Sequence, residues 1–385
     1  MFQIKKVLFF ALIFSSLFFL EYFISFSEGS KERVIGIIMS AEEAENKYSS
    51  DIRDSVIFQI RNLNQKLESK KQISLVFIKA GKTAESAAES VQLLYLKHKV
   101  LAIIGPSQIN QAISSAKAAE NLGVPFISLS SSEELNDVLR NWAFSIAPSA
   151  SLEVDLLLDF LKERNLRKIA LLSFPKKNAL EARKQIFSRS PKKQISILSD
   201  KIFKLKEYNF HSYLGSKKIE SSDAVVHWTV NSSSLDLIKA SLTYKGHQQF
   251  FILGHDSFER KNFKDINAIR PIYFIIPKFF TEPFLPTFYE YKKQVLSFRM
   301  NFEYQFGRKP TIFAARSVDA IKILSSAIFQ SDGQRKFILE YLKKISKFNG
   351  LTGNFNLVKN KNHLISNAYA IVNFQNGIWN LESFD

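Results

Sequence analysis

The chain contains no cysteine. This absence excludes disulfide bonds, thiolate metal ligands and cysteine nucleophiles, and it also excludes a lipid anchor attached through an N-terminal cysteine. Hydrophobic residues make up 46% of the chain and charged residues 23%, which is ordinary for a folded globular protein. With 385 residues, the chain is long enough for two domains.

Motifs of common enzyme sites are also missing from the sequence. There is no His-Glu-x-x-His, no Gly-x-Ser-x-Gly, no phosphate-binding glycine-rich loop and no Gly-x-Gly-x-x-Gly fingerprint. His227, His247 and His255 could converge with Asp256 on a zinc ion, although histidines in loops are more often simply solvated. We therefore expect no catalysis, no cofactor and no metal.

The N-terminal residues have the pattern of an export signal. Lys5 and Lys6 precede an apolar run from Val7 to Leu20, and the small residues Ser25 and Ser27 follow at a spacing that a signal peptidase accepts. We expect cleavage after Ser27, so that residues 1–27 form a signal peptide. An uncleaved anchor over residues 7–26 is the alternative, because this segment is about long enough to span a bilayer. Both interpretations place the remaining chain in the periplasm, with membrane contact only through this segment if it stays attached.

The net charge of +17 is unevenly distributed, because residues 160–220 hold 16 Lys/Arg against five Asp/Glu. An anionic partner, such as lipid head groups or an acidic ligand, is one interpretation. Pairs such as Lys176-Lys177 and Lys192-Lys193 lie in predicted loops and helix faces, which favours a solvated surface instead. Because no basic motif interleaved with aromatic residues is present, we expect no nucleic-acid partner.

Residues 104–132 form the most informative segment of the chain. Residues 100–104 are a short apolar run that Gly105-Pro106 ends, residues 112–122 carry apolar side chains at helical spacing, and residues 124–129 resume an apolar strand. This order predicts a strand–helix–strand unit of a parallel sheet. Ligands of such sheets bind outside the carboxyl ends of the strands, where helix N-termini offer free N–H groups. Ser107 and the run from Ser130 to Ser132 fall at those ends.

Strands alternate with helices along most of the chain, in two separate series, and the second series includes a helix over residues 210–219. Residues 353–358 and 367–374 are expected to form short terminal strands, the latter followed by an Asn376-Gly377 turn. The pattern predicts an α/β protein with two doubly wound parallel sheets, each the core of one lobe. From about residue 282 the pattern is helical, and these helices are expected to pack back onto the earlier sheets. We therefore expect one lobe from residues 31–148 plus about 282–350, and a second from residues 149–281 plus about 351–385.

Several segments, in order, carry a family resemblance over nearly the whole chain. They are VIGIIM, VLAIIGPS, LGVPFISLSSS, FSIAP, RKIALLS, SSDAVVHW, FFILGHD, FGRKPTIFAARSVDAIKILSSAI and FNGLTGNF. The chain resembles a type I periplasmic solute-binding protein of the Leu/Ile/Val-binding kind. This resemblance implies two Rossmann-like lobes, joined by crossover strands, that close on a small ligand in the cleft between them.

The resemblance also implies which residues contact the ligand. In the first lobe these are Ser107 and the three serines at 130–132, whose hydroxyls and backbone N–H groups would hold a carboxylate. Tyr48 would cover the ligand, and Asp256 would pair with a ligand ammonium. Asn178 and Trp228 are the candidates in the second lobe.

Each of these residues also has a structural interpretation. Ser131 has the capping-box spacing to Glu134, Asp256 could cap a helix, Tyr48 could cover only a helix start, and Trp228 could pack in the core. The chain departs from the family pattern at three positions, where Ile109 replaces a common serine, and Asn178 and Val230 stand where aromatic residues are usual.

These observations lead to two functional hypotheses. The first is an exported solute-binding protein that captures an amino acid, amide or short carboxylate for the membrane permease of an ABC-type transporter. The alternative is a periplasmic interaction or regulatory module of the same fold with a degenerate cleft. The losses at Ile109, Asn178 and Val230 favour the module, whereas the serines at 130–132 and Asp256 favour binding.

Overall fold

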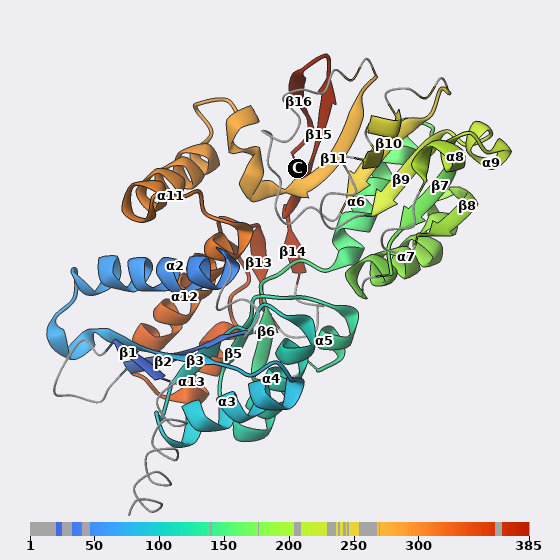
Figure 1. Ribbon diagram of the computed structural model, residues 1–385. Coiled ribbons are helices and arrows are strands. Elements are labelled where there is room, and N and C mark those ends of the chain that lie inside the picture. The colour runs from blue at the N-terminus through green and yellow to red at the C-terminus, as the bar shows by residue number, and fades with distance from the viewer. Residues whose placement is uncertain are drawn as a thin grey trace, which may run out of the picture.

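The computed structural model describes most of the chain beyond the N-terminal segment. The described residues are 21–24, 33–40, 47–138, 141–175, 177–203, 209–228, 236–253 except 238, 242, 243 and 245, and 268–384 except 269 and 359–363. Figure 1 shows two α/β lobes, each built on its own sheet, with crossing segments between them. The predicted α/β fold class with two lobes is confirmed. Both sheets are mainly parallel, but antiparallel strands at their edges make them mixed, which the sequence pattern did not predict.

The first sheet has the strand order β1-β3-β2-β4-β5-β6. All neighbouring strands pair in parallel except β1, which lies in the expected signal segment and pairs antiparallel with β3. The strands of this sheet are β1 (Glu21–Ile24), β2 (Arg33–Met39), β3 (Ile73–Lys79), β4 (Ala102–Ile104), β5 (Phe126–Ser128) and β6 (Ala143–Ser145). The helices between them are α2 (Lys47–Asn64), the short 3-10 helix η1 (Ser69–Lys71), α3 (Ala84–Leu96), α4 (Ile109–Leu122) and α5 (Glu133–Val138).

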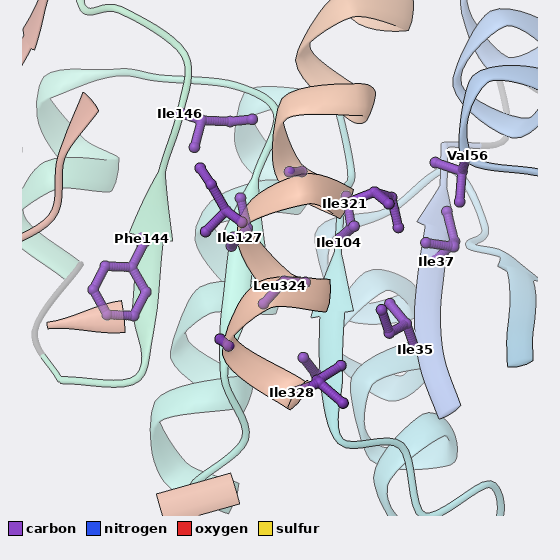
Figure 2. Packing of buried hydrophobic residues seen from close by; sticks show 14 of the residues in the cluster. Ile35, Ile37, Val56, Ile104, Ile127, Phe144, Ile146, Ile321, Leu324 and Ile328 are labelled. Atoms are coloured by element: carbon purple, nitrogen blue, oxygen red, sulfur yellow. The ribbon is translucent and has the colours of Figure 1, made fainter. Parts of the chain in front are cut away.

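Helices cover both faces of the first sheet, because successive side chains of each buried strand point to opposite faces. Val34 and Ile38 of β2 pack against α3 and α4, whereas Ile35 and Ile37 pack against α2 and two later helices, α12 (Ile312–Gln330) and α13 (Arg335–Leu342). In Figure 2, Ile321, Leu324 and Ile328 of α12 lie against the isoleucines of the strands. The C-terminal helices therefore complete the first lobe.

The second sheet has the strand order β16-β15-β11-β10-β9-β7-β8. Its parallel strands are β7 (Lys168–Ser173), β8 (Ser196–Ile202), β9 (Ala224–Trp228), β10 (Gln249–Leu253) and β11 (Ile272–Pro277), and β15 (Tyr369–Gln375) and β16 (Ile378–Ser383) add an antiparallel hairpin. The predicted Asn376-Gly377 turn joins this hairpin, and both residues have positive φ (51° and 77°) as a two-residue hairpin turn requires. The helices of this lobe are α6 (Ala150–Glu163), α7 (Lys177–Arg189), η2 (Ser190–Lys193), α8 (Phe210–Leu214) and α9 (Lys217–Glu220).

One helix expected from the sequence, over residues 210–219, is divided in the structure. Gly215 ends α8, and Ser216 precedes α9. Glycine favours the end of a helix because its backbone loses more conformational entropy in a helix than that of other residues. Phe210, Leu214 and Ile219 still share one buried cluster, so the apolar spacing that suggested a single helix is satisfied by two short ones.

The chain passes between the two sheets three times. It leaves the first sheet after β6 to enter α6, and it returns from β11 through the 3-10 helix η4 (Lys278–Phe284) and α11 (Glu290–Phe306) to α12. The last passage follows a small three-stranded sheet of β12 (Phe348–Asn349), β13 (Asn354–Asn356) and β14 (Leu364–Ser366), after which β15 joins the second sheet. Phe355 of β13 packs in the core of the first lobe, so this small sheet is attached to that lobe.

A buried carboxylate holds the loop between β12 and β13 of this small sheet. Asp319 of α12 is completely buried and accepts hydrogen bonds from the backbone N–H groups of Leu351 (2.8 Å) and Thr352 (2.9 Å) and from the Thr352 hydroxyl (2.8 Å). Tyr291 of α11 donates its own hydroxyl to the Leu351 carbonyl at 2.7 Å. A side chain at Gly350 would lie 2.7 Å from the Asp319 carboxylate, so glycine is needed there.

We predict that Asp319 makes the stability of the protein depend on pH. Burial raises the pKa of this carboxyl from 3.8 to about 6, although its hydrogen bonds to Leu351 and Thr352 act in the opposite direction. Between about pH 4 and pH 6 the folded protein therefore binds a proton that the unfolded chain does not, so this group's contribution to the unfolding free energy increases as the pH falls through that window. Between pH 7 and pH 4, the unfolding free energy of the wild type should rise by on the order of 3 kcal/mol relative to that of Asp319→Asn. Urea unfolding at both pH values measures this difference. A difference between the two proteins that stays constant with pH would contradict this assignment.

Candidate functional site

The first candidate site lies where the strand order of the first sheet reverses. β2 has β3 on one side and β4 on the other, so the carboxyl ends of β2 and β4 flank the switch point at which doubly wound sheets bind their ligands. Ser40 follows β2, and Ser107 follows the Gly105-Pro106 turn after β4. Gly105 has φ of 101°, and a Cβ there would lie 2.2 Å from the Ile38 carbonyl oxygen, so β2 and the turn are in close contact.

Two hydroxyl groups at this switch point have no hydrogen-bond partner among the described residues. Ser40 is completely buried and Ser107 is 8% exposed, and both Oγ atoms are unpaired within that part of the chain. An unpaired buried hydroxyl costs roughly 1–3 kcal/mol. Both groups are therefore candidates for contact with a bound ligand. The sequence analysis identified Ser107 but missed Ser40, although Ser40 directly follows the first predicted strand.

Ser130 connects neighbouring loops at the same edge of the sheet. Its hydroxyl donates to the Ser107 backbone carbonyl, and its own carbonyl accepts hydrogen bonds from the hydroxyls of Ser128 (2.8 Å) and Ser145 (3.0 Å). The ends of β4, β5 and β6 are therefore held together by serine hydroxyls. The Ser130 hydroxyl is thus engaged in a hydrogen bond to the Ser107 carbonyl, whereas the Ser107 hydroxyl has no partner among the described residues.

Ser132 caps a helix rather than facing solvent. Its Oγ accepts a hydrogen bond from the backbone N–H of Leu135 at 3.0 Å, at the start of α5, and the Ser132 side chain is 1% exposed. The expectation that Ser131 provides this cap is wrong by one residue, because α5 begins at Glu133 and a capping side chain reaches the N–H three positions ahead. Ser131 is partly exposed.

The second sheet has a corresponding switch point between β7 and β9, because β8 lies on the other side of β7. Ser173 ends β7 and Trp228 ends β9, and the two are paired in register. Both are buried, and neither the Ser173 hydroxyl nor the Trp228 indole N–H has a partner among the described residues. The Trp228 ring packs in the core of the second lobe, in line with the structural interpretation of this residue. Ser173 was missed from the sequence although it ends the RKIALLS segment.

The other sequence-predicted residues lie in different surroundings. Tyr48 is in the first turn of α2 and packs edge-on against Phe313 of α12, with ring centroids 5.4 Å apart. Asn178 is the second residue of α7, the helix that follows β7. Ile109 begins α4 and packs against the first-lobe core, so it offers no polar group there. Asp256, His255 and Val230 lie outside the described residues, so their predicted roles remain predictions.

The histidine and charge patterns have structural explanations where they are described. His227 is completely buried, with its ring 5.8 Å from that of Phe174 and 5.6 Å from that of Phe210. No group of three or more metal-binding side chains occurs within the described ranges.

In the basic region of residues 160–220, Arg189 pairs with Asp155 at 2.7 Å and Lys193 pairs with Asp159. These ion pairs join α6 to α7 and η2, which agrees with a structural role for part of the excess charge.

A cavity of about 370 Å³ lies away from both switch points. It is bordered by the end of α2 and by Ile73 and Leu75 of β3. Ile73 begins its strand, so this cavity is at the amino edge of the sheet, opposite the edge that carries Ser40 and Ser107. Because ligands of such sheets bind at the carboxyl edge, this cavity is not part of the candidate site.

Comparison with known proteins identifies the family. Residues 53–377 match the model of the receptor family ligand binding region. The chain belongs to this family. A comparison with curated protein sequences gives no match. The family consists of ligand-binding regions, which agrees with the resemblance noted in the sequence.

Solved structures with the same fold are branched-chain amino acid and other substrate-binding proteins. A putative branched-chain amino acid ABC transporter protein from Rhodospirillum rubrum has a TM-score of 0.76 at 12% identity, over 91% of this chain and 100% of that one. An ABC transporter substrate-binding protein from Desulfitobacterium hafniense, in complex with Leu, has a TM-score of 0.71 at 14% identity over the same shares. LivJ from Streptococcus pneumoniae, in complex with isoleucine, has a TM-score of 0.68 at 19% identity, over 92% of this chain and 100% of that one. The two-lobe type I periplasmic binding fold is thereby established.

Within the described ranges, no helix has both the length and the apolar character needed to cross a membrane. The apolar run from Val7 to Leu20 lies outside those ranges.

Ser107 and Ser132 have different surroundings, so substituting each by alanine should change the unfolding free energy by different amounts. Ser132→Ala removes the cap of α5 and should lower the unfolding free energy by about 1 kcal/mol. Ser107→Ala removes a hydroxyl without a partner among the described residues, so it should leave stability unchanged or raise it slightly. Chemical denaturation of the two variants and the wild type measures both effects. Equal losses from the two changes would show that the Ser107 hydroxyl has a structural partner.

Proposed function

We propose that the chain is an exported solute-binding protein that captures a small organic ligand between its lobes and presents it to the permease of an ABC-type transporter. The observation that carries this proposal is the set of buried polar groups at both switch points that have no hydrogen-bond partner among the described residues. Ser40 and Ser107 supply hydroxyls from the first lobe, and the second lobe supplies the Ser173 hydroxyl and the Trp228 indole N–H. A ligand that forms hydrogen bonds with groups of both lobes at once would favour the closed arrangement of the two lobes.

The chemistry of these groups favours an amino acid, an amide or a short carboxylate. All four are neutral, so they suit carboxylate or amide oxygens and N–H groups rather than a strongly charged ligand. α4 begins two residues after Ser107, and its N-cap residue Gln108 makes no side-chain capping hydrogen bond. The N-terminal turn of a helix favours an anionic group, which supports a carboxylate at this end of the ligand. Asp256 remains the proposed partner of a ligand ammonium.

Export is part of this proposal and rests on the N-terminal sequence. Removal of residues 1–27 would also remove β1, whose four residues pair with β3, and would leave β3 as the sheet edge. An uncleaved anchor would keep that strand.

The alternative, a periplasmic regulatory module with a degenerate cleft, is favoured by specific contacts in the first lobe. Ile109 packs on the lobe core where the family often has a ligand-binding hydroxyl. Ser130 and Ser132 use their hydroxyls within the protein, so fewer groups are left for a ligand than the sequence suggested. A ligand screen separates the two functions.

We predict that a cognate ligand stabilises the protein and that two serines contribute to its affinity. At a hundredfold excess over Kd, a ligand stabilises the folded state by about 2.7 kcal/mol, which raises the melting temperature by several degrees. A thermal-shift screen of amino acids, amides, short carboxylates and polyamines should find such a compound. Titration calorimetry should then show Ser107→Ala and Ser173→Ala each weakening its binding by about 0.5–1.5 kcal/mol.

Ser222→Ala is the matched control for this experiment. Ser222 is completely buried in the second lobe, but its hydroxyl donates to the Ile219 carbonyl at 2.7 Å, so its loss should lower stability and leave affinity unchanged. No shift from any compound would favour the regulatory module. Binding that neither Ser107→Ala nor Ser173→Ala weakens would show that the ligand occupies another site.

A further inference from the structure

The outward face of α11 carries a row of large apolar side chains in contact with solvent. Leu296, Met300 and Tyr304 follow one another at intervals of four residues and are 37%, 60% and 95% exposed. Residues four apart lie on the same side of a helix, so these three form one stripe. Tyr289 and Phe288, just before the helix, are 39% and 76% exposed. We call these five residues the α11 strip.

The α11 strip is not needed to hold the helix in place. Val295, Phe298 and Phe302 lie on the opposite side of α11 and are buried in a cluster with α12 and Phe279. The helix is therefore apolar on two sides, and only one of them has a partner in the described structure. Contiguous exposed apolar surface of this kind marks an interaction site more often than single exposed residues do.

The strip continues beyond the helix into the C-terminal part of the chain. The rings of Phe288 and Tyr289 have centroids 5.0 Å apart, and Tyr289 lies 6.0 Å from Phe384, which follows β16. In Figure 1, α11 lies at the outer margin of the molecule, beyond α2 and α12. A protruding helix can contact an extended surface without obstruction from the rest of the protein.

The charges of the strip and of the chain indicate the partner. Lys293 is exposed within the same helix face, with Glu290 3.8 Å away, and Lys309 is exposed just beyond the helix. The whole chain carries a net charge of +17. Lys293 lies four residues after Tyr289 and three before Leu296, so its long apolar stem is close to an aromatic and an aliphatic side chain. A lysine beside exposed tyrosine and aliphatic side chains suits the interface of an anionic bilayer.

We propose that the α11 strip docks on an anionic lipid surface. Tyr289 and Tyr304 would lie at the head-group level, with Leu296 and Met300 between them in contact with the outer acyl chains. Such a contact is weak by itself, and it would act together with the attraction of the basic chain to the membrane. It would keep the protein beside a membrane whatever ligand it binds, so this proposal does not depend on the proposed solute.

A tryptophan placed in the strip reports directly on this contact. In the exported protein, Tyr304→Trp should show a blue shift of its added emission with vesicles of phosphatidylglycerol and phosphatidylcholine at physiological salt. Dibrominated lipids should quench that emission. Leu96→Trp, at a position 68% exposed at the end of α3, is the matched control and should show neither change. The readout is local, so it applies whether or not the N-terminal segment is retained.

A second variant separates the strip from general charge attraction. Leu296→Ser, Met300→Ser and Tyr304→Ser combined leave the charge unchanged and should weaken vesicle binding at least tenfold, with an unchanged melting temperature. Leu96→Ser with Ile378→Ser removes two other exposed apolar side chains and should bind as the wild type does. Equal binding by the triple variant would overturn the proposal in favour of charge alone. Emission of Tyr304→Trp that no vesicle shifts would overturn it in favour of a protein partner.

Discussion

The Asp319 carboxylate fixes the loop between β12 and β13, in the small sheet from which the chain crosses to the second lobe. The two sheets have separate hydrophobic cores, and without cysteine no disulfide can join them. Asp319 accepts three hydrogen bonds from Leu351 and Thr352, and Tyr291 holds the same loop from α11. A buried carboxylate is tolerated only when it is hydrogen-bonded in this way. The first lobe thus holds the small sheet of β12, β13 and β14 in place, and the chain leaves this sheet for β15.

Serine hydroxyls divide into two groups at the carboxyl ends of the strands. Those of Ser128, Ser130 and Ser145 bind backbone carbonyls and join the ends of three strands, and that of Ser132 caps α5. Ser40, Ser107 and Ser173 have buried hydroxyls with no such partner among the described residues. The first group joins the ends of neighbouring strands, and the second places hydrogen-bonding groups without a described partner at the same edges of the sheets. Not every serine at these edges therefore has a structural role for its hydroxyl, and this supports the proposed binding function.

Local patterns in the sequence predicted most of the fold. The apolar runs and helical spacing around residues 100–129 predict a strand–helix–strand unit, and β4, α4 and β5 confirm it. The Asn376-Gly377 turn was also predicted, because its residue types have few other uses between strands. The break at Gly215 was missed, since the apolar spacing across it continues unchanged.

The candidate site was harder to predict because it depends on contacts between distant residues. Whether Ser107 or Ser130 keeps a free hydroxyl is decided by the approach of two loops that are separate in sequence, and no local pattern encodes it. Ser40 and Ser173 gain their importance from the strand order, which places them at the switch points. Tyr48 was expected over a ligand, and its contact with Phe313 of α12 could not be foreseen from residues 265 positions apart. The resemblance and the strand–helix pattern predicted polar residues at the carboxyl edges of the sheets, and their role in ligand binding remains a prediction. The structure shows which of these hydroxyls have a partner among the described residues.

The central claim is that the two lobes move relative to each other when a ligand binds between them. The absence of cysteine allows spin labels to be placed at will, for example at Leu96→Cys on α3 and Leu180→Cys on α7, which are 68% and 39% exposed in the wild type. Pulsed electron paramagnetic resonance then measures the distance between the lobes with and without the ligand found by thermal shift. The account predicts that the ligand shifts and narrows the distance distribution. A ligand that calorimetry shows to bind, but that leaves this distribution unchanged, would contradict it.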